Sequence, residues 1–182
     1  MSLVLASTSP QRRAILTQLG FDFRVVEPAY VEKPLAVPPA ELVETHSRGK
    51  ARSVERTAGE TVIGVDTIVV CDGDVLGKPA DACSALDMLR RLAGREHTVC
   101  SGLTVIDDLG ERTAHAGTRV VFRELADVAI RSYVDLEEWR GRAGGYAIQE
   151  RGALLVERVE GDYLNVVGLP VALLVKLLEA AG

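Results

Sequence analysis

The chain has 182 residues, 47% of them hydrophobic, and a formal net charge of −5. This length and composition are enough for one hydrophobic core, and we expect residues 1–182 to form a single domain. The acidic balance lacks the cationic surface that neutralises a nucleic-acid polymer, which argues against such a partner. Residues 1–6 contain no basic leader and only a four-residue apolar run, so the sequence predicts a soluble cytoplasmic protein without a membrane segment.

The first part of the chain predicts a strand, a polar turn and a helix. Residues 3–6 form a short apolar run before three hydroxyl residues and Pro10. Serine favours the N-cap position and proline the first helical position, so Ser9 and Pro10 predict a helix start. Gly20 predicts its end. Residues 28–39 hold four of the seven prolines, which predicts an irregular loop, and residues 40–56 predict the next helix.

The middle of the chain is dominated by an apolar run. Residues 62–70 are rich in β-branched side chains and predict a central strand buried on both faces. Asp72-Gly73 predicts a hairpin turn, after which residues 75–77 return as a second strand. Asp81 predicts the cap of a helix that ends at Gly94.

The second half alternates strands and helices. Residues 97–106, 113–122 and 153–159 predict strands, whereas 126–136 and 170–181 predict helices. Because through-strands and hairpins both occur, the pattern favours a mixed α/β sheet over a purely parallel one.

The start of the first predicted helix has the chemistry of a phosphate site. Ser7, Ser9, Arg12 and Arg13 bring hydroxyls and guanidinium groups to a helix N-terminus. Free backbone N–H groups, the helix dipole and arginine forks all favour an oxyanion. An ordinary N-cap with two solvated arginines fits the local pattern equally well.

Asp66 is the sharpest single feature, because it interrupts an apolar strand. An unpaired buried carboxylate is costly, so it requires a metal or a lysine, and either arrangement lets it activate water. A structural ion pair is the alternative. Lys50 and Lys78 are candidate cations, although a lone lysine is more often solvated. Glu32, in the proline-rich loop, is a candidate metal ligand, although a lone loop carboxylate is usually solvated.

Two further motifs have competing interpretations. Asp72-Gly73-Asp74 resembles the metal motif of sugar-nucleotide enzymes, but Asp-Gly between strands is first of all a turn. Gln149 follows a glycine pair and offers a donor and an acceptor to a base edge. A glycine hinge beside a core aromatic is the alternative for that segment.

Taken together, five segments resemble the Maf family of nucleoside triphosphate pyrophosphatases over nearly the whole chain. They are residues 5–13, 50–51, 64–67 with 77–79, 143–149 and 165–170. The resemblance implies an elongated mixed β-sheet flanked by helices, with two lobes around a cleft, as in inosine triphosphate pyrophosphatase. It also implies a divalent metal, Mg²⁺ or Mn²⁺, and a homodimer.

The resemblance also implies roles by position. Asp66 matches the position of the family's proton acceptor, and Asp66 and Glu32 match acidic positions at the metal. Thr67 and Gln149 match positions linked to base choice. The positions that contact phosphate in the family are matched by Ser7, Arg12, Arg13, Lys50 and Lys78.

Two positions depart from the family pattern. Gln11 stands where the dTTP/UTP subgroup has arginine and the 7-methylguanosine triphosphate subgroup a bulky aromatic residue. Gly49 stands where the family often has an acidic residue. This departure predicts a less stable helix at this point, or the loss of one contact near the metal.

The function that the resemblance implies is attack of water on the α-phosphorus of a nucleoside triphosphate, giving the monophosphate and pyrophosphate. Thr67 and Gln149 favour pyrimidine substrates, dTTP, UTP or CTP, or modified nucleotides, and thus a house-cleaning role. Three alternatives stay open: a 7-methylguanosine triphosphate pyrophosphatase, a nucleotidyltransferase, and a non-catalytic nucleotide-binding regulator of cell division.

Overall fold

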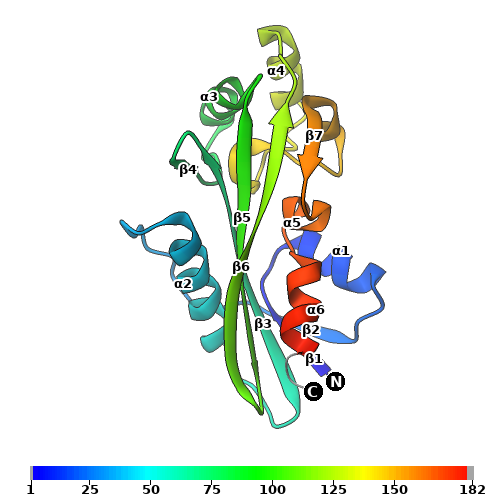
Figure 1. The fold of residues 1–182 in the computed structure, drawn as a ribbon. Helices are drawn as coiled ribbons and strands as arrows, with labels where there is room; N and C mark the ends of the chain where they lie inside the picture. The colour runs from blue at the N-terminus through cyan, green and yellow to red at the C-terminus, as the bar shows by residue number, and fades with distance from the viewer. Residues whose placement is uncertain (1, 180–182) are drawn as a thin grey trace. The chain divides into compact units, whose positions relative to one another are not determined.

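The computed structural model describes residues 2–179 as a mixed α/β fold with a seven-stranded sheet flanked by helices (Figure 1). The strand order is β2-β1-β3-β5-β6-β7, and β4 pairs with β3. Pairs β1–β2 and β1–β3 are parallel, whereas β3–β4 and β6–β7 are antiparallel. The predicted mixed sheet is therefore confirmed. The strands are β1 (Ser2–Ala6), β2 (Phe23–Val26), β3 (Glu60–Cys71), β4 (Asp74–Leu76), β5 (Glu96–Asp107), β6 (Gly110–Phe122) and β7 (Val156–Glu160).

The helices largely follow the predicted pattern. They are α1 (Pro10–Gln18), α2 (Pro39–Arg52), α3 (Ala82–Leu92), α4 (Asp127–Val134), α5 (Tyr163–Val167), α6 (Val171–Glu179) and the 3₁₀ helices η1 (Ala143–Gly145) and η2 (Arg151–Leu155). Strand β2 and helix α5 were not predicted, and the predicted strand 153–159 begins only at Val156 because η2 precedes it. Residues 180 and 181 of the predicted last helix lie outside the described residues. No helix within residues 2–179 is long and apolar enough to cross a membrane.

The chain divides into two compact units. The first comprises Met1–Thr67, Cys100–Ala116 and Gly168–Gly182, and the second Ile68–Val99 and Gly117–Val167. Strands β3, β5 and β6 contribute residues to both units.

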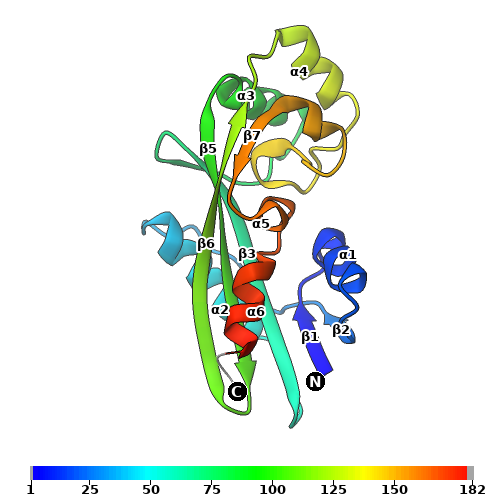
Figure 2. The same ribbon diagram turned by 45° about the vertical axis from the view of Figure 1, so that its right-hand side comes forward.

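In the first unit, helix α2 packs directly on the sheet. A Cβ atom on Gly64 of β3 would lie 2.2 Å from the carbonyl oxygen of Ser47, and one on Gly102 of β5 would lie 2.1 Å from that of Val43. Both strands therefore use glycine where the helix backbone approaches. Figure 2 shows that α1 follows the end of β1. A small hydrophobic core that includes Val4 and Val62 also lies in this unit.

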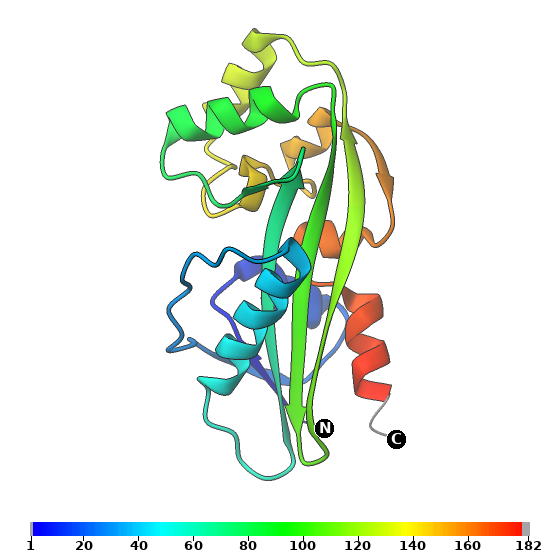
Figure 3. The ribbon, with the colours of Figure 1, turned by 60° about the vertical axis from the view of Figure 1, so that its left-hand side comes forward.

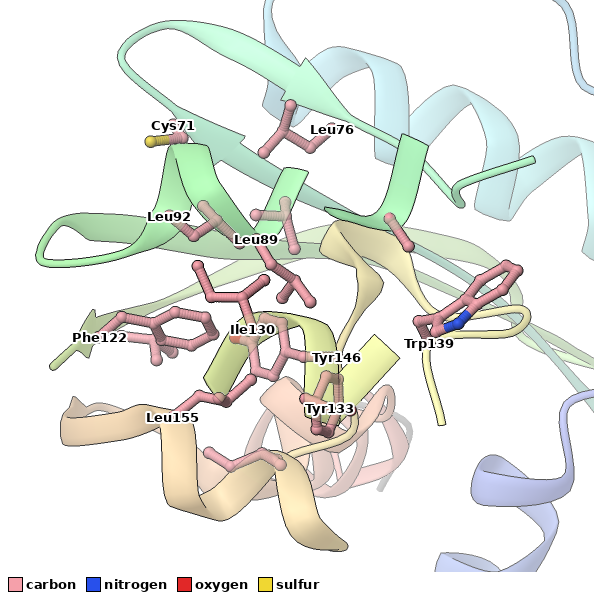
Figure 4. Packing of buried hydrophobic residues seen from close by; sticks show 14 of the residues in the cluster. Cys71, Leu76, Leu89, Leu92, Phe122, Ile130, Tyr133, Trp139, Tyr146 and Leu155 are labelled. Atoms are coloured by element: carbon pink, nitrogen blue, oxygen red, sulfur yellow. The ribbon is translucent and has the colours of Figure 1, made fainter. Parts of the chain in front are cut away.

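In the second unit, helices α3 and α4 and the 143–155 region contribute to a hydrophobic core of aliphatic and aromatic side chains (Figure 4). The rings of His97, Phe122 and Tyr146 meet edge to face, with centroids 4.8–5.5 Å apart. Nε2 of His97 lies 2.9 Å from the Tyr146 hydroxyl. Burial in this core lowers the pKa of His97 from 6.5 to about 4, so the ring is neutral near pH 7.

Candidate active site

Asp66 and Lys50 form a buried ion pair in the first unit. Asp66 lies on β3 and Lys50 on α2, and their side chains meet with Nζ 2.6 Å from Oδ1. The two residues are only 5% and 8% exposed. The ammonium also lies 3.4 Å from the carbonyl oxygen of Val65. The prediction that Asp66 requires a cation is confirmed, and that cation is the lysine of α2.

A second carboxylate reaches the same ammonium. Glu32, in the connection between β2 and α2, places Oε1 2.6 Å from Lys50 Nζ. Figure 3 shows this connection running beside α2. Tyr30, in the same connection, is hydrogen bonded to His46, with 3.0 Å between its hydroxyl and Nδ1. Burial first, and then the charges of Glu32 and Asp66, raise the pKa of the Tyr30 phenol.

Arg12 is buried at the start of α1 and is held by three side-chain hydrogen bonds. Its Nε donates to the carbonyl oxygen of Gly168 at 2.8 Å, and its terminal nitrogens donate to Ser7 Oγ at 3.0 Å and Thr67 Oγ1 at 3.1 Å. Burial lowers its pKa, and the charges of Asp66 and Glu32 oppose that shift. The structure thus brings Ser7, Arg12 and Thr67 together.

The neighbouring residues of α1 behave differently. Ser9 caps the helix as predicted, since its Oγ accepts from the Arg12 backbone N–H at 3.5 Å. The same hydroxyl donates to Oε1 of Gln11 at 3.2 Å. Arg13 is exposed, and no hydrogen bond or ion pair of its side chain is found within residues 2–179. The start of α1 therefore has both the Ser9 N-cap and the two arginines, Arg12 and Arg13.

Sequence reasoning missed Ser101 as part of this network. Its Oγ lies 2.9 Å from Thr67 Oγ1, which extends the chain of polar contacts from Arg12 into β5. The signal in the sequence is a serine within an apolar run, because a polar side chain buried in a strand requires a hydrogen-bond partner.

Lys78 and Gln149 belong to the second unit. Lys78 is exposed, and the backbone N–H of Gly144 donates to the neighbouring Gly77 carbonyl at 3.0 Å. Within this unit, Gly77 therefore contacts residues 144–145, the glycine pair that precedes Gln149 in the chain. The Gln149 amide nitrogen donates to Glu150 Oε1 at 3.3 Å.

The Asp72-Gly73-Asp74 segment is a turn, as its preferred interpretation predicted. Residues 71 and 74 pair across it, and Asp72 and Gly73 have φ of 51° and 84°, as a two-residue hairpin requires. Asp72 pairs with Arg95 at 2.5 Å, and Asp74 with Arg91. Both carboxylates thus have arginine partners.

The donor set suits a metal that arrives with its substrate. No group of three or more His, Cys, Asp or Glu side chains able to hold a metal occurs within residues 2–179. Asp66 and Glu32, however, contact one ammonium and so place two carboxylates side by side. Mg²⁺ commonly binds through one or two carboxylates together with substrate phosphates and water, so the residues present fit such an ion.

Comparison with known proteins places this chain in a family. The family model described as Maf-like protein matches residues 2–181. The chain belongs to the Maf-like protein family. A dTTP/UTP pyrophosphatase of Pelotomaculum thermopropionicum is 46% identical over 99% of this chain and 96% of its own length. A dTTP/UTP pyrophosphatase of Thermococcus gammatolerans is also 46% identical, over 97% and 95%.

Solved structures agree on the fold. The Ham1 protein of Staphylococcus aureus superposes with a TM-score of 0.56 at 12% identity, covering 100% of both chains. A HAM1 protein of Coxiella burnetii gives 0.50 at 15% identity, covering 98% of this chain and 99% of its own. At such low identity these similarities concern the fold alone.

Proposed function

We propose that this protein hydrolyses dTTP and UTP to the nucleoside monophosphate and pyrophosphate, acting as a single domain over residues 1–182. The observation that carries the proposal is the buried Asp66 carboxylate in contact with Lys50, with Glu32 on the same ammonium. The full-length relatives named dTTP/UTP pyrophosphatase support the choice of substrate.

Asp66 is the proton acceptor in this proposal. Lys50 engages Oδ1, and no hydrogen bond to Oδ2 is found within residues 2–179. Oδ2 takes a proton from a water molecule while the water oxygen bonds to the α-phosphorus. The bond from that phosphorus to the bridging oxygen breaks, and pyrophosphate leaves with the electron pair. The phosphate charge is neutralised by Arg12, Arg13, Lys50 and Lys78, with Ser7 as a further contact.

Glu32 and Asp66 would hold a Mg²⁺ or Mn²⁺ ion, which would supply further neutralisation of the phosphate charges. Base choice falls to Gln11, Thr67 and Gln149, whose side chains offer donors and acceptors. The proposal includes a cytoplasmic homodimer, in line with the family resemblance.

Hydrolysis in ¹⁸O-labelled water tests the proposal directly. Purified protein with Mg²⁺ is given dTTP, UTP, CTP and 7-methylguanosine triphosphate in turn, and both products are analysed by mass spectrometry. We expect dTTP and UTP to be the best substrates, with the label in the monophosphate because water attacks the α-phosphorus. Label in pyrophosphate, or release of orthophosphate and a diphosphate, would refute the mechanism. Preference for 7-methylguanosine triphosphate would refute the substrate.

A further inference from the structure

Gly49 lies within α2, where glycine has no evident backbone role. Its φ is not positive, and glycine in a helix interior costs about 1 kcal/mol relative to alanine. The space that a side chain would need is occupied by Tyr30. A Cβ atom on Gly49 would lie 2.2 Å from Cε2 of the Tyr30 ring and 2.5 Å from both Cδ2 and Cζ. The glycine therefore forms a notch into which the phenol ring packs.

The Tyr30 hydroxyl has a second fixed contact on the same helix. It lies 3.0 Å from Nδ1 of His46, which is itself buried. His46 precedes Gly49 by three residues, and residues at that spacing share one helix face. The ring centroids of Tyr30 and His46 are 5.8 Å apart. A steric contact and a hydrogen bond together set the position of the tyrosine on α2.

This docking has a direct consequence for Glu32. Residues 27–36 have no helix or strand of their own, so their backbone is not held by a ladder. Val31 is 75% exposed, whereas the side chains of the residues on either side of it contact α2. Glu32 contacts Lys50, the residue directly after Gly49. The tyrosine and the carboxylate are thus bound to adjacent points of the same helix.

We propose that Tyr30 is a positioning residue: packed into the Gly49 notch and bonded to His46, it holds the 28–38 loop so that Glu32 stays on Lys50 beside Asp66. In this role Tyr30 acts through Glu32, which contacts Lys50. The inference rests on the proposed function for its catalytic consequence, but the docking itself does not depend on any activity.

Hydrogen–deuterium exchange of the metal-free, nucleotide-free protein tests the docking alone. The variants are Tyr30→Ala, Tyr30→Phe and Gly49→Ala, and the matched controls are Tyr163→Phe and Gly117→Ala. Tyr163 is exposed, and a Cβ on Gly117 meets only Thr98 Cγ2, at 3.5 Å. We expect exchange in 28–38 to rise about tenfold in Tyr30→Ala and Gly49→Ala, less in Tyr30→Phe, and not in the controls.

The double variant Tyr30→Ala/Gly49→Ala distinguishes the notch from general damage. Once the ring is absent, the new methyl group has nothing to displace, so the second substitution should add no further exchange in the loop. Additive effects of the two substitutions, or wild-type exchange in Tyr30→Ala, would overturn the proposal.

Steady-state kinetics then measures the consequence for Glu32. In Tyr30→Ala, the Mg²⁺ concentration for half-maximal activity should rise about tenfold while kcat at saturating Mg²⁺ stays within about threefold, and Tyr30→Phe should recover part of the loss. An equal fall of kcat at every Mg²⁺ concentration would overturn the positioning role. Absence of activity in the wild-type protein would refute the proposed function and leave the exchange result intact.

Discussion

Replacing Asp66 by asparagine tests the centre of the proposed site, because the change keeps the volume and removes the charge. The carboxylate is 5% exposed and bonded to Lys50 through Oδ1. An amide oxygen can still accept that hydrogen bond, but an amide does not take a proton from water. Loss of a general base lowers turnover by about 10²–10⁴-fold, so we expect Asp66→Asn to lose at least about 10²-fold in kcat.

The effect on stability should be smaller than for an orphaned charge. Removing one partner of a buried ion pair costs roughly 3–5 kcal/mol when the other charge is left alone. In this variant Lys50 still has its ion pair with Glu32. The free energy of unfolding should therefore fall by roughly 1.5–3 kcal/mol, as for the loss of a hydrogen bond to a charged group. Urea unfolding measures this term separately from the kinetics.

Asp108→Asn is the matched control for this experiment. Asp108 pairs with Arg56 at the same 2.6 Å distance, but on the surface of the β5–β6 connection. It should leave kcat unchanged and shift the free energy of unfolding by less than about 1 kcal/mol. Near-normal turnover in Asp66→Asn would show that Asp66 is a structural carboxylate and would refute the reasoning.

Gln11→Ala should change the relative kcat/KM among dTTP, UTP, CTP and 7-methylguanosine triphosphate by about tenfold if Gln11 reads the base; a uniform loss would assign it to the Ser9 contact instead. Below pH 6.5 the unfolded chain binds a proton that buried His97 does not, so the free energy of unfolding should fall by roughly 3 kcal/mol between pH 6.5 and 4. His97→Gln should remove that dependence in urea titrations at each pH, and an unchanged pH slope would contradict it. Gly64→Ala should cost more than about 2 kcal/mol in urea unfolding because its Cβ would lie 2.2 Å from a helix carbonyl, whereas Gly117→Ala should not; equal effects would contradict the close packing.

The requirement for a cation at Asp66 was predictable, because a carboxylate within an apolar strand requires one. Which cation it would be was not predictable from local pattern. Lys50 and Lys78 were equally eligible, and only the close approach of α2 to the glycines of β3 and β5 brings Lys50 to the carboxylate. Long-range packing of this kind leaves little trace in the local sequence.

The missed elements were short and weakly patterned. Strand β2 has four residues, and Arg24 interrupts its apolar run; the strand pairs with β1 at the sheet edge. Helix α5 has five residues, fewer than two turns. Residues 153–155 were assigned to a strand from their apolar character, but they belong to η2, where Gly152 packs on the Ala147 carbonyl. Gly49 suggested a looser helix, yet α2 continues through it.

The two adjacent arginines of α1 show why the phosphate-site and N-cap interpretations did not exclude each other. Neighbouring helical residues point in different directions, so Arg12 turns inward and Arg13 outward. Arg12 donates three hydrogen bonds, to Ser7, Thr67 and the Gly168 carbonyl. These bonds connect β3 and the segment before α6 to the start of α1. The charges of Asp66 and Glu32 act on Arg12, whereas Arg13 has no partner within residues 2–179. We therefore expect Arg13 to meet an incoming triphosphate first, with Arg12 holding the loop that receives it.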